Sequence, residues 1–171
     1  MIKARRVLAA TAVGLLALSG CVHDSGVAAR VAGATLTEVQ VRQAADAVAA
    51  ADQTNDAGLY LAPVANALVQ GLVSGEVAAA SGVTLTDATR AETIGANPSL
   101  AQLQQLGAGM LADRMADYVY TRTKLGEEAF LAGCAAVPVS VNPRYGNWSK
   151  ELCSLDGQSG SLSRPAKAAT N

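Results

Sequence analysis

The sequence has no excess of positive charge, almost no histidine and few aromatic side chains. Its 171 residues include 13 Lys and Arg, 14 Asp and Glu, and one His. A near-neutral chain excludes a polybasic nucleic-acid binder, and a single His excludes a zinc site made of several histidines. Aromatic residues make up 4 % of the chain, but 50 % of it is apolar. This apolar content can form a core, so wholesale disorder is excluded.

Short catalytic motifs are also missing. The sequence contains no G-x-S-x-G, no G-x-x-x-x-G-K phosphate loop and no C-x-x-C pair. The only histidine, His23, stands two residues after Cys21, in a segment that could hardly orient it as a general base. We therefore expect no enzyme activity, no cofactor and no metal site.

The first twenty residues are typical of a secretory signal. Lys3, Arg5 and Arg6 form a basic start, and the apolar run Val7–Leu18 that follows is shorter than the roughly 20 residues of a spanning helix. The next residues, Leu18–Cys21 (LSGC), resemble the lipobox of bacterial lipoproteins. The resemblance implies cleavage after residue 20 and diacylation of Cys21, which would anchor the protein at the extracytoplasmic face of the cell membrane. An ordinary signal whose cleavage site happens to precede a Cys is the alternative.

Export also bears on charge and on the other two cysteines. Without its first twenty residues the chain keeps ten basic and 14 acidic side chains, so membrane attachment would come from lipid rather than from charge. Outside the cytoplasm Cys134 and Cys153 can pair, closing a loop of about 20 residues worth roughly 3 kcal/mol. Two buried free thiols are the alternative, and we favour the bridge.

The composition divides the chain into four segments. Residues 1–20 are the signal, and residues 21–26 are the lipidated Cys and a short polar tether. Residues 27–153 have the length of one domain. Residues 154–171 are rich in Ser, Gly, Ala and Lys, and we expect them to form a disordered tail.

Local patterns predict a mainly α fold, in which a helical bundle carries a small β element formed by an N-terminal hairpin and a C-terminal strand. Ala32-Gly33 suits a hairpin turn, and Thr37 with Gln40 forms a T-x-x-Q capping box. The helix at 59–80 is apolar around most of its circumference, which places it at the centre of the bundle. The remaining elements are expected in this order: a strand pair at 27–31 and 34–36, helices at 37–52, 86–94, 97–124 with a break at Gly107 or Gly109, and 127–132, and an edge strand at 137–141.

Four stretches carry a resemblance to a known family: Ala29–Thr37 (ARVAGATLT), Leu68–Leu72 (LVQGL), Ala79–Ala88 (AASGVTLTDA) and Val139–Trp148 (VSVNPRYGNW). Their order and spacing over residues 27–150 resemble the N-terminal domain of SurA-type periplasmic chaperones, in its actinobacterial lipoprotein form. The resemblance implies a holdase-like chaperone that binds unfolded secreted polypeptides. It does not extend to a prolyl-isomerising parvulin domain, because only about twenty residues follow Trp148, and a parvulin domain takes about ninety.

Candidate peptide-binding residues lie on the central helix, on the fourth helix and after the last strand. They are Leu68, Leu72, Leu111, Met115, Tyr118, Tyr145 and Trp148. Met110 and Met115 are more often plain core than an adaptable binding surface, and Tyr145 and Trp148 more often pack the strand exit beside the disulfide than form a hot spot. On the same fourth helix, Asp113, Arg114 and Asp117 could hold a cation or do acid–base work, but a solvated face with local ion pairs is favoured.

Two function classes follow from these patterns. One is the holdase-like chaperone. The other is a structural or adaptor lipoprotein that docks one folded partner and has no chaperone activity. A contiguous apolar groove of more than a few hundred Å² on the folded surface would favour the chaperone, and a polar, Ala-smoothed surface would favour the adaptor.

Overall fold

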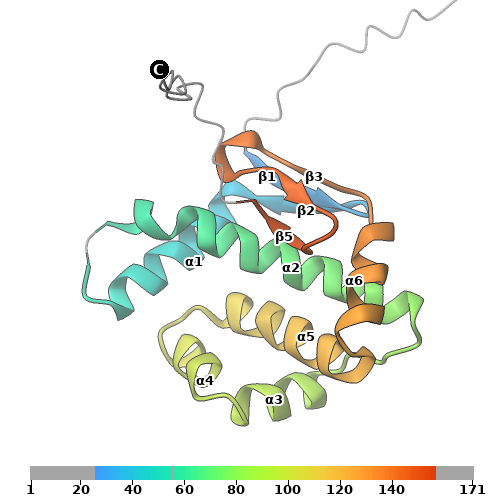
Figure 1. Cartoon of the computed structure of the whole chain (residues 1–171). Coiled ribbons are helices and arrows are strands. Elements are labelled where there is room, and N and C mark those ends of the chain that lie inside the picture. The colour runs from blue at the N-terminus through green and yellow to red at the C-terminus, as the bar shows by residue number, and fades with distance from the viewer. Residues whose placement is uncertain (1–25, 55, 157–171) are drawn as a thin grey trace, which may run out of the picture.

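The described chain begins in a three-stranded sheet and ends in a two-stranded one, both at the same end of the molecule, and most of the helices lie below them (Figure 1). The computed structural model describes residues 26–54 and 56–156. The predicted signal, Cys21 and most of the tether, and residues 157–171 of the predicted tail, therefore lie outside the described residues. The mainly α fold with a small β element is confirmed.

The elements follow one another in this order: β1 Val27–Val31, β2 Ala34–Thr37, α1 Glu38–Ala51, η1 Ala57–Tyr60, α2 Leu61–Ala80, α3 Asp87–Gly95, α4 Pro98–Gln105, α5 Gly109–Leu125, α6 Glu127–Ala136, β3 Val139–Val141, η2 Pro143–Tyr145, β4 Trp148–Ser149 and β5 Ser154–Leu155.

The main sheet has the order β2-β1-β3, and both of its pairings are antiparallel. Ala32 and Gly33 form the predicted hairpin turn with φ of 47° and 97°, the left-handed pair that matches the twist of a two-residue hairpin. On the other side of β1, Ala29 faces Val141. The edge strand predicted near the C-terminus thus joins the N-terminal hairpin across more than 100 residues.

Local capping signals set the helix ends. Thr37 and Gln40 make the predicted capping box at the start of α1. Gly82, with φ of 71°, ends α2 as predicted, and Val83 N–H then donates to the Ala78 carbonyl, which satisfies an orphan carbonyl of the last turn. Asn97 caps α4, and the break expected near Gly107 separates α4 from α5.

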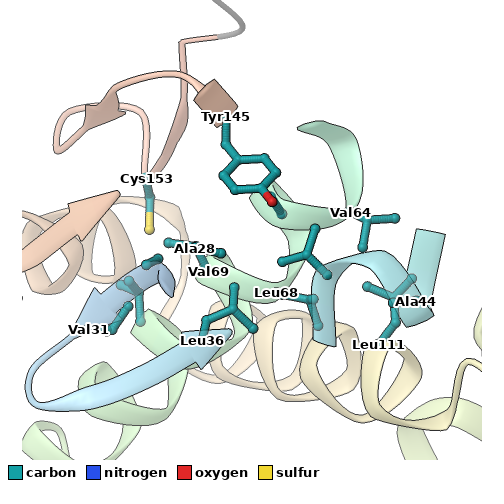
Figure 2. Close-up of a cluster of buried hydrophobic side chains, with 14 of the residues drawn as sticks. Ala28, Val31, Leu36, Ala44, Val64, Leu68, Val69, Leu111, Tyr145 and Cys153 are labelled. Carbon is teal, nitrogen blue, oxygen red and sulfur yellow. The ribbon is translucent and has the colours of Figure 1, made fainter. Parts of the chain in front are cut away.

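The main core lies between the sheet, α1, α2 and α5, with Phe130 and Cys134 of α6 completing it (Figure 2). Helix α2 is its centre: Leu68, Val69, Val73 and Val77 are each no more than 1 % exposed. Together with η1, this helix is also long and apolar enough to cross a membrane by length and composition alone. The central helix of a folded domain passes the same test, and that is its place in this structure.

The strand predicted from Val137 begins at Val139, and the α-helix predicted from Leu59 begins at Leu61. Two other predicted boundaries are wrong by more than two residues. Helix α6 runs to Ala136 rather than to Ala132, because its second half packs on α2, where Gly133 lies against Val77 and Cys134 is fully buried. The disordered tail does not begin at Ser154, because Ser154–Leu155 pairs with Trp148–Ser149 as the two-stranded sheet β4-β5. The composition of residues 154–156 does not reveal this pairing, which depends on contacts with α2.

Candidate functional site

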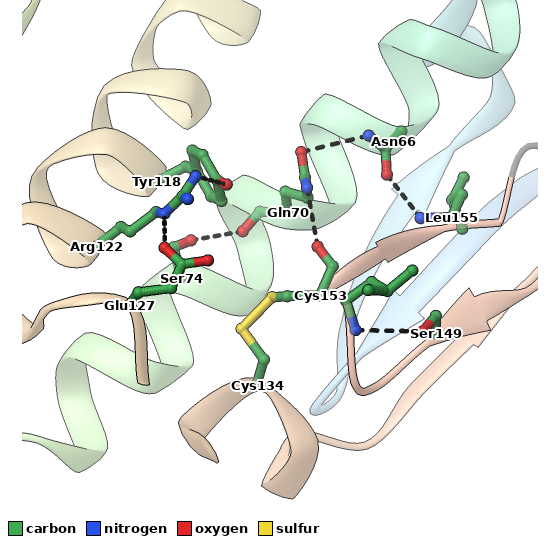
Figure 3. The surroundings of a disulfide bond; sticks show 11 residues. Asn66, Gln70, Ser74, Tyr118, Arg122, Glu127, Cys134, Ser149, Cys153 and Leu155 are labelled. Atoms are coloured by element: carbon green, nitrogen blue, oxygen red, sulfur yellow. Dashed lines mark hydrogen bonds and ion pairs between the residues drawn. A yellow bond between two sulfur atoms is a disulfide. The ribbon is translucent and has the colours of Figure 1, made fainter. Parts of the chain in front are cut away.

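A disulfide and side chains of α2 hold residues 153–155, the closing segment of the domain, in place (Figure 3). Cys134 of α6 and Cys153 are joined, with an S–S distance of 2.07 Å and Cα atoms 5.7 Å apart. The predicted pairing is therefore present in the structure. Gln70 Nε2 donates to the Cys153 carbonyl at 2.8 Å, and the Leu155 N–H donates to Asn66 Oδ1 at 2.8 Å. These contacts fix β5 against the one helix that also centres the main core.

The segment between β3 and β4 is tied to the start of α1. The Arg144 guanidinium pairs with Glu38 at 2.6 Å, and the Asn142 amide donates to the same carboxylate at 3.3 Å. Beside them, Tyr145 enters the main core and is 4 % exposed, and its burial raises the pKa of the phenol. Trp148 is half-buried against the same core. Both aromatic residues thus pack the strand exit near the disulfide, the arrangement favoured over a peptide-contact patch.

The predicted peptide-binding residues do not surround an open groove in this structure. Leu68 and Leu111 are 1 % and 4 % exposed, while the other helical candidates, Leu72, Met115 and Tyr118, are half-buried against the same core. A stripe of apolar residues at helical spacing has the same pattern whether it faces a ligand or another helix. Here it faces another helix, so contact with a peptide would first require the core to open.

Helices α2 and α5 approach too closely to leave space between them. A Cβ atom built on Gly71 of α2 would lie 2.5 Å from both the Cβ and the carbonyl oxygen of Arg114 on α5. The cavity that Leu68 and Leu72 help to line beside this contact has a volume of about 50 Å³, room for a few water molecules. The site expected between these helices is therefore a packed interface.

Hollows of larger volume lie on the outer side of α5. One of about 270 Å³ separates α3 from α5, and one of about 430 Å³ lies over the turn from α5 to α6. Val119 and Thr123 line both of them. Tyr120 adds an aromatic wall to the first, and Tyr118 adds one to the second. Tyr118 is therefore the candidate from the helical stripe that reaches one of these surface hollows.

A buried carboxylate joins α5 to α3. Asp117 is 1 % exposed and accepts from Arg90 through both oxygens, at 2.7 Å from Nε and 3.3 Å from Nη2. Arg114 adds a second guanidinium at 3.6 Å. The solvated face predicted here is therefore wrong for Asp117. The hydrogen bond to Asp117 raises the pKa of Arg90, and the carboxylate is committed to this pair rather than free for acid–base work.

Sequence reasoning missed Arg90 as the partner of Asp117, because the two residues are 27 positions apart and on different helices. The i,i+3 pairs that Arg90 makes with Asp87 and Arg114 makes with Asp117 were visible in the spacing. Among residues 26–54 and 56–156, no group of three or more His, Cys, Asp and Glu side chains is placed to hold a metal ion.

Comparison with protein-family models, curated proteins and solved structures finds no match for this chain. The resemblance to SurA-type chaperones accordingly rests on the four sequence stretches alone. The choice between a holdase-like chaperone and an adaptor therefore depends on the geometry of the domain.

Proposed function

We propose that the protein is a lipid-anchored extracytoplasmic adaptor that docks a folded partner on the outside of a rigid domain and catalyses no reaction. The observation that carries this proposal is the burial of the residues expected to bind peptides, above all Leu68 and Leu111. A binding module with a closed core offers its partner only the existing surface.

That surface has large apolar side chains at separate places. Among the described residues, the exposed large hydrophobic side chains are Val39, Leu59, Leu106 and Leu152. They lie on α1, on η1, just after α4 and in the β4-β5 loop. Single exposed apolar residues are normal on a folded protein, whereas a holdase needs a contiguous patch. The distribution therefore favours docking of a folded partner over capture of unfolded chains.

The holdase-like chaperone is the second candidate. The hollows along α5 favour it, because Tyr118, Val119 and Tyr120 offer aromatic and aliphatic surface to an extended segment. The SurA resemblance supports the same function. Affinity would be modest, because an extended peptide loses conformational entropy when it is ordered on such a shallow surface.

Cross-linking in membranes of the source cells separates the two functions. An adaptor should give a discrete adduct of defined mass, and the purified protein in molar excess should not slow the aggregation of an unfolded polypeptide. A broad series of adducts together with suppressed aggregation would overturn the adaptor in favour of the holdase. The variant Tyr118→Ala removes one aromatic wall of the α5 hollows. It should weaken the suppression of aggregation only if the protein is a holdase that uses these hollows.

The anchor has its own test, the variant Cys21→Ala. Because the lipobox Cys would carry the acyl chains, the variant should be lost from the membrane fraction or remain unprocessed. Val22→Ala, which leaves the acceptor thiol in place, should behave as the wild type. Recovery of the wild-type chain in soluble form with an unmodified Cys21 would contradict the anchor.

A further inference from the structure

Helices α3 and α4 have a hydrophobic cluster of their own, which touches the main core through Leu103 and Met115. This small core consists of Ile94 and Leu100, which pack on Ala112 and Ala116 of α5. Among the described residues, the main core contains twenty buried residues, from the main sheet, the other helices and the segments that connect them. Figure 1 shows the two helices at the end of the molecule opposite the sheet, with α5 between them and α2. Their principal contacts are with α5 and with each other.

The chain leaves and returns to the rest of the domain through left-handed glycines. Gly82 precedes α3 with φ of 71°, and Gly107 follows α4 with φ of 81°. No heavy atom of a neighbouring element lies within 4 Å of the Cβ position at either glycine. Hydrogen bonds across the two glycines, from Val83 N–H to the Ala78 carbonyl and from Ala108 N–H to the Leu103 carbonyl, must break before the backbone turns there. Rotation at these two points would then move residues 87–105 together, because glycine adopts other backbone conformations without a steric penalty.

One charged contact reinforces the small core. The carboxylate of Asp117 is 1 % exposed and accepts two hydrogen bonds from the guanidinium of Arg90, the cation of α3. The third hydrogen bond of this guanidinium goes to Asp87 within α3. A buried charge that loses its partner is strongly unfavourable. When α3 moves away, Asp117 must regain water or rely on Arg114 at 3.6 Å. The Arg90–Asp117 pair therefore makes opening more costly than packing of Ile94 and Leu100 alone would.

We propose that residues 87–105 form a flap that opens as a unit about Gly82 and Gly107 while the disulfide-linked main core stays folded, with the Arg90–Asp117 pair as its latch. Opening exposes Ala112 and Ala116 of α5 and the side of Met115 that packs on the small core, an apolar strip that runs into the hollow lined by Val119. Regions with few buried apolar contacts are those that open below the free energy of global unfolding. The inference does not depend on the adaptor function, because it concerns a motion of the domain itself.

Native-state hydrogen exchange on the full-length protein tests the flap. In the wild type, amides of α3 and α4 should exchange through an opening at least about tenfold more populated than the one that exposes α2, and with a weaker dependence on denaturant. If the amides of the flap and of α2 exchange with the same opening free energy and the same dependence on denaturant, the proposal is overturned. This test needs no variant.

The latch is tested with Arg90→Gln and a matched control. Loss of the guanidinium should speed exchange in the flap by at least about tenfold. It should speed exchange of α2 by the same factor, because the pair is also broken in the globally unfolded state. Arg122→Gln removes an arginine from α5 that pairs with Glu127 outside the flap, and it should leave the flap unchanged. No acceleration of the flap by Arg90→Gln, or the same acceleration of the flap by Arg122→Gln, would refute the latch. If Arg90→Gln does not fold, the pair supports the whole domain rather than the flap, and the latch is refuted as well.

Discussion

The two faces of α5 are covered in different ways. Toward α2 the helix contributes Leu111 to a core of twenty buried residues, and the two backbones come close enough to require Gly71. Toward α3 and α4 it presents mainly Ala112 and Ala116, which bury little apolar area, so each contributes less than a larger side chain would. The second face adds a buried ion pair, Arg90 with Asp117. A weakly apolar face can thus be covered where charge pairing supplements packing.

The same contrast holds for what ties each region to the rest of the chain. The sheet side is cross-linked by Cys134–Cys153 and by α2 side chains that reach the closing segment. The disulfide Cys134–Cys153 lies outside the flap. The flap is held on α5 by side-chain packing and by Arg90. Three sets of substitutions, taken from the largest expected effect to the smallest, test this difference between the two regions.

Removal of the disulfide has the largest expected effect. The bridge spans 19 positions, so Cys134→Ser with Cys153→Ser should lower the free energy of unfolding by about 3 kcal/mol. Urea unfolding monitored by circular dichroism measures this loss. Exchange in the flap, which opens below global unfolding, should change much less than exchange in the main sheet.

The bridge itself is checked first by intact mass. The oxidised chain should be about two daltons lighter than the reduced chain, since two hydrogens are lost when the bond forms. Complete alkylation of Cys134 and Cys153 without reductant would contradict the bridge, and with it the difference in covalent linkage between the two regions.

Gly71→Ala breaks the close approach of α2 and α5. The new Cβ would meet Arg114 at 2.5 Å, including its backbone carbonyl oxygen, so the helices must separate at a cost of about 2 kcal/mol. Gly75→Ala is the matched control on the same helix, since nothing lies within 4 Å of its Cβ position. That variant should gain about 0.5–1 kcal/mol from the better helix former. Thermal unfolding of both variants checks the pair, and equal shifts would contradict the close approach.

Turns, caps and helix ends could be predicted from the sequence, because each depends on only a few neighbouring residues. The turn at Ala32-Gly33, the cap formed by Thr37 with Gln40 and the stop at Gly82 all depend on backbone and side-chain preferences of neighbouring residues. The structure contains each of them. The mainly α fold followed from their order and from the apolar helix at 59–80.

The candidate site could not be predicted in the same way. A stripe containing Leu111 and Met115 shows that one face of a helix is apolar, but not whether that face meets a ligand or another helix. Likewise, the role of Gly71 and the pairing of Arg90 with Asp117 depend on which helices pack together. Those contacts join positions far apart in the chain, and no local pattern encodes them.

The smallest expected effect comes from the N-caps, and it tests directly whether the two regions unfold separately. Thr37 caps α1 and Thr86 caps α3, each through a capping box, so replacing either with Ala removes about 1 kcal/mol from its own helix. Thr37→Ala should lower global stability by that amount, because α1 packs into the main core. Thr86→Ala should lower it by a similar amount and also raise exchange in α3 and α4. Thr37→Ala should leave exchange in α3 and α4 unchanged, since α1 stays folded when the flap opens. Measuring both variants by urea unfolding and by hydrogen exchange compares the same chemical change in the two regions. Equal acceleration of flap exchange by the two variants would mean that the flap and the main core unfold as one unit.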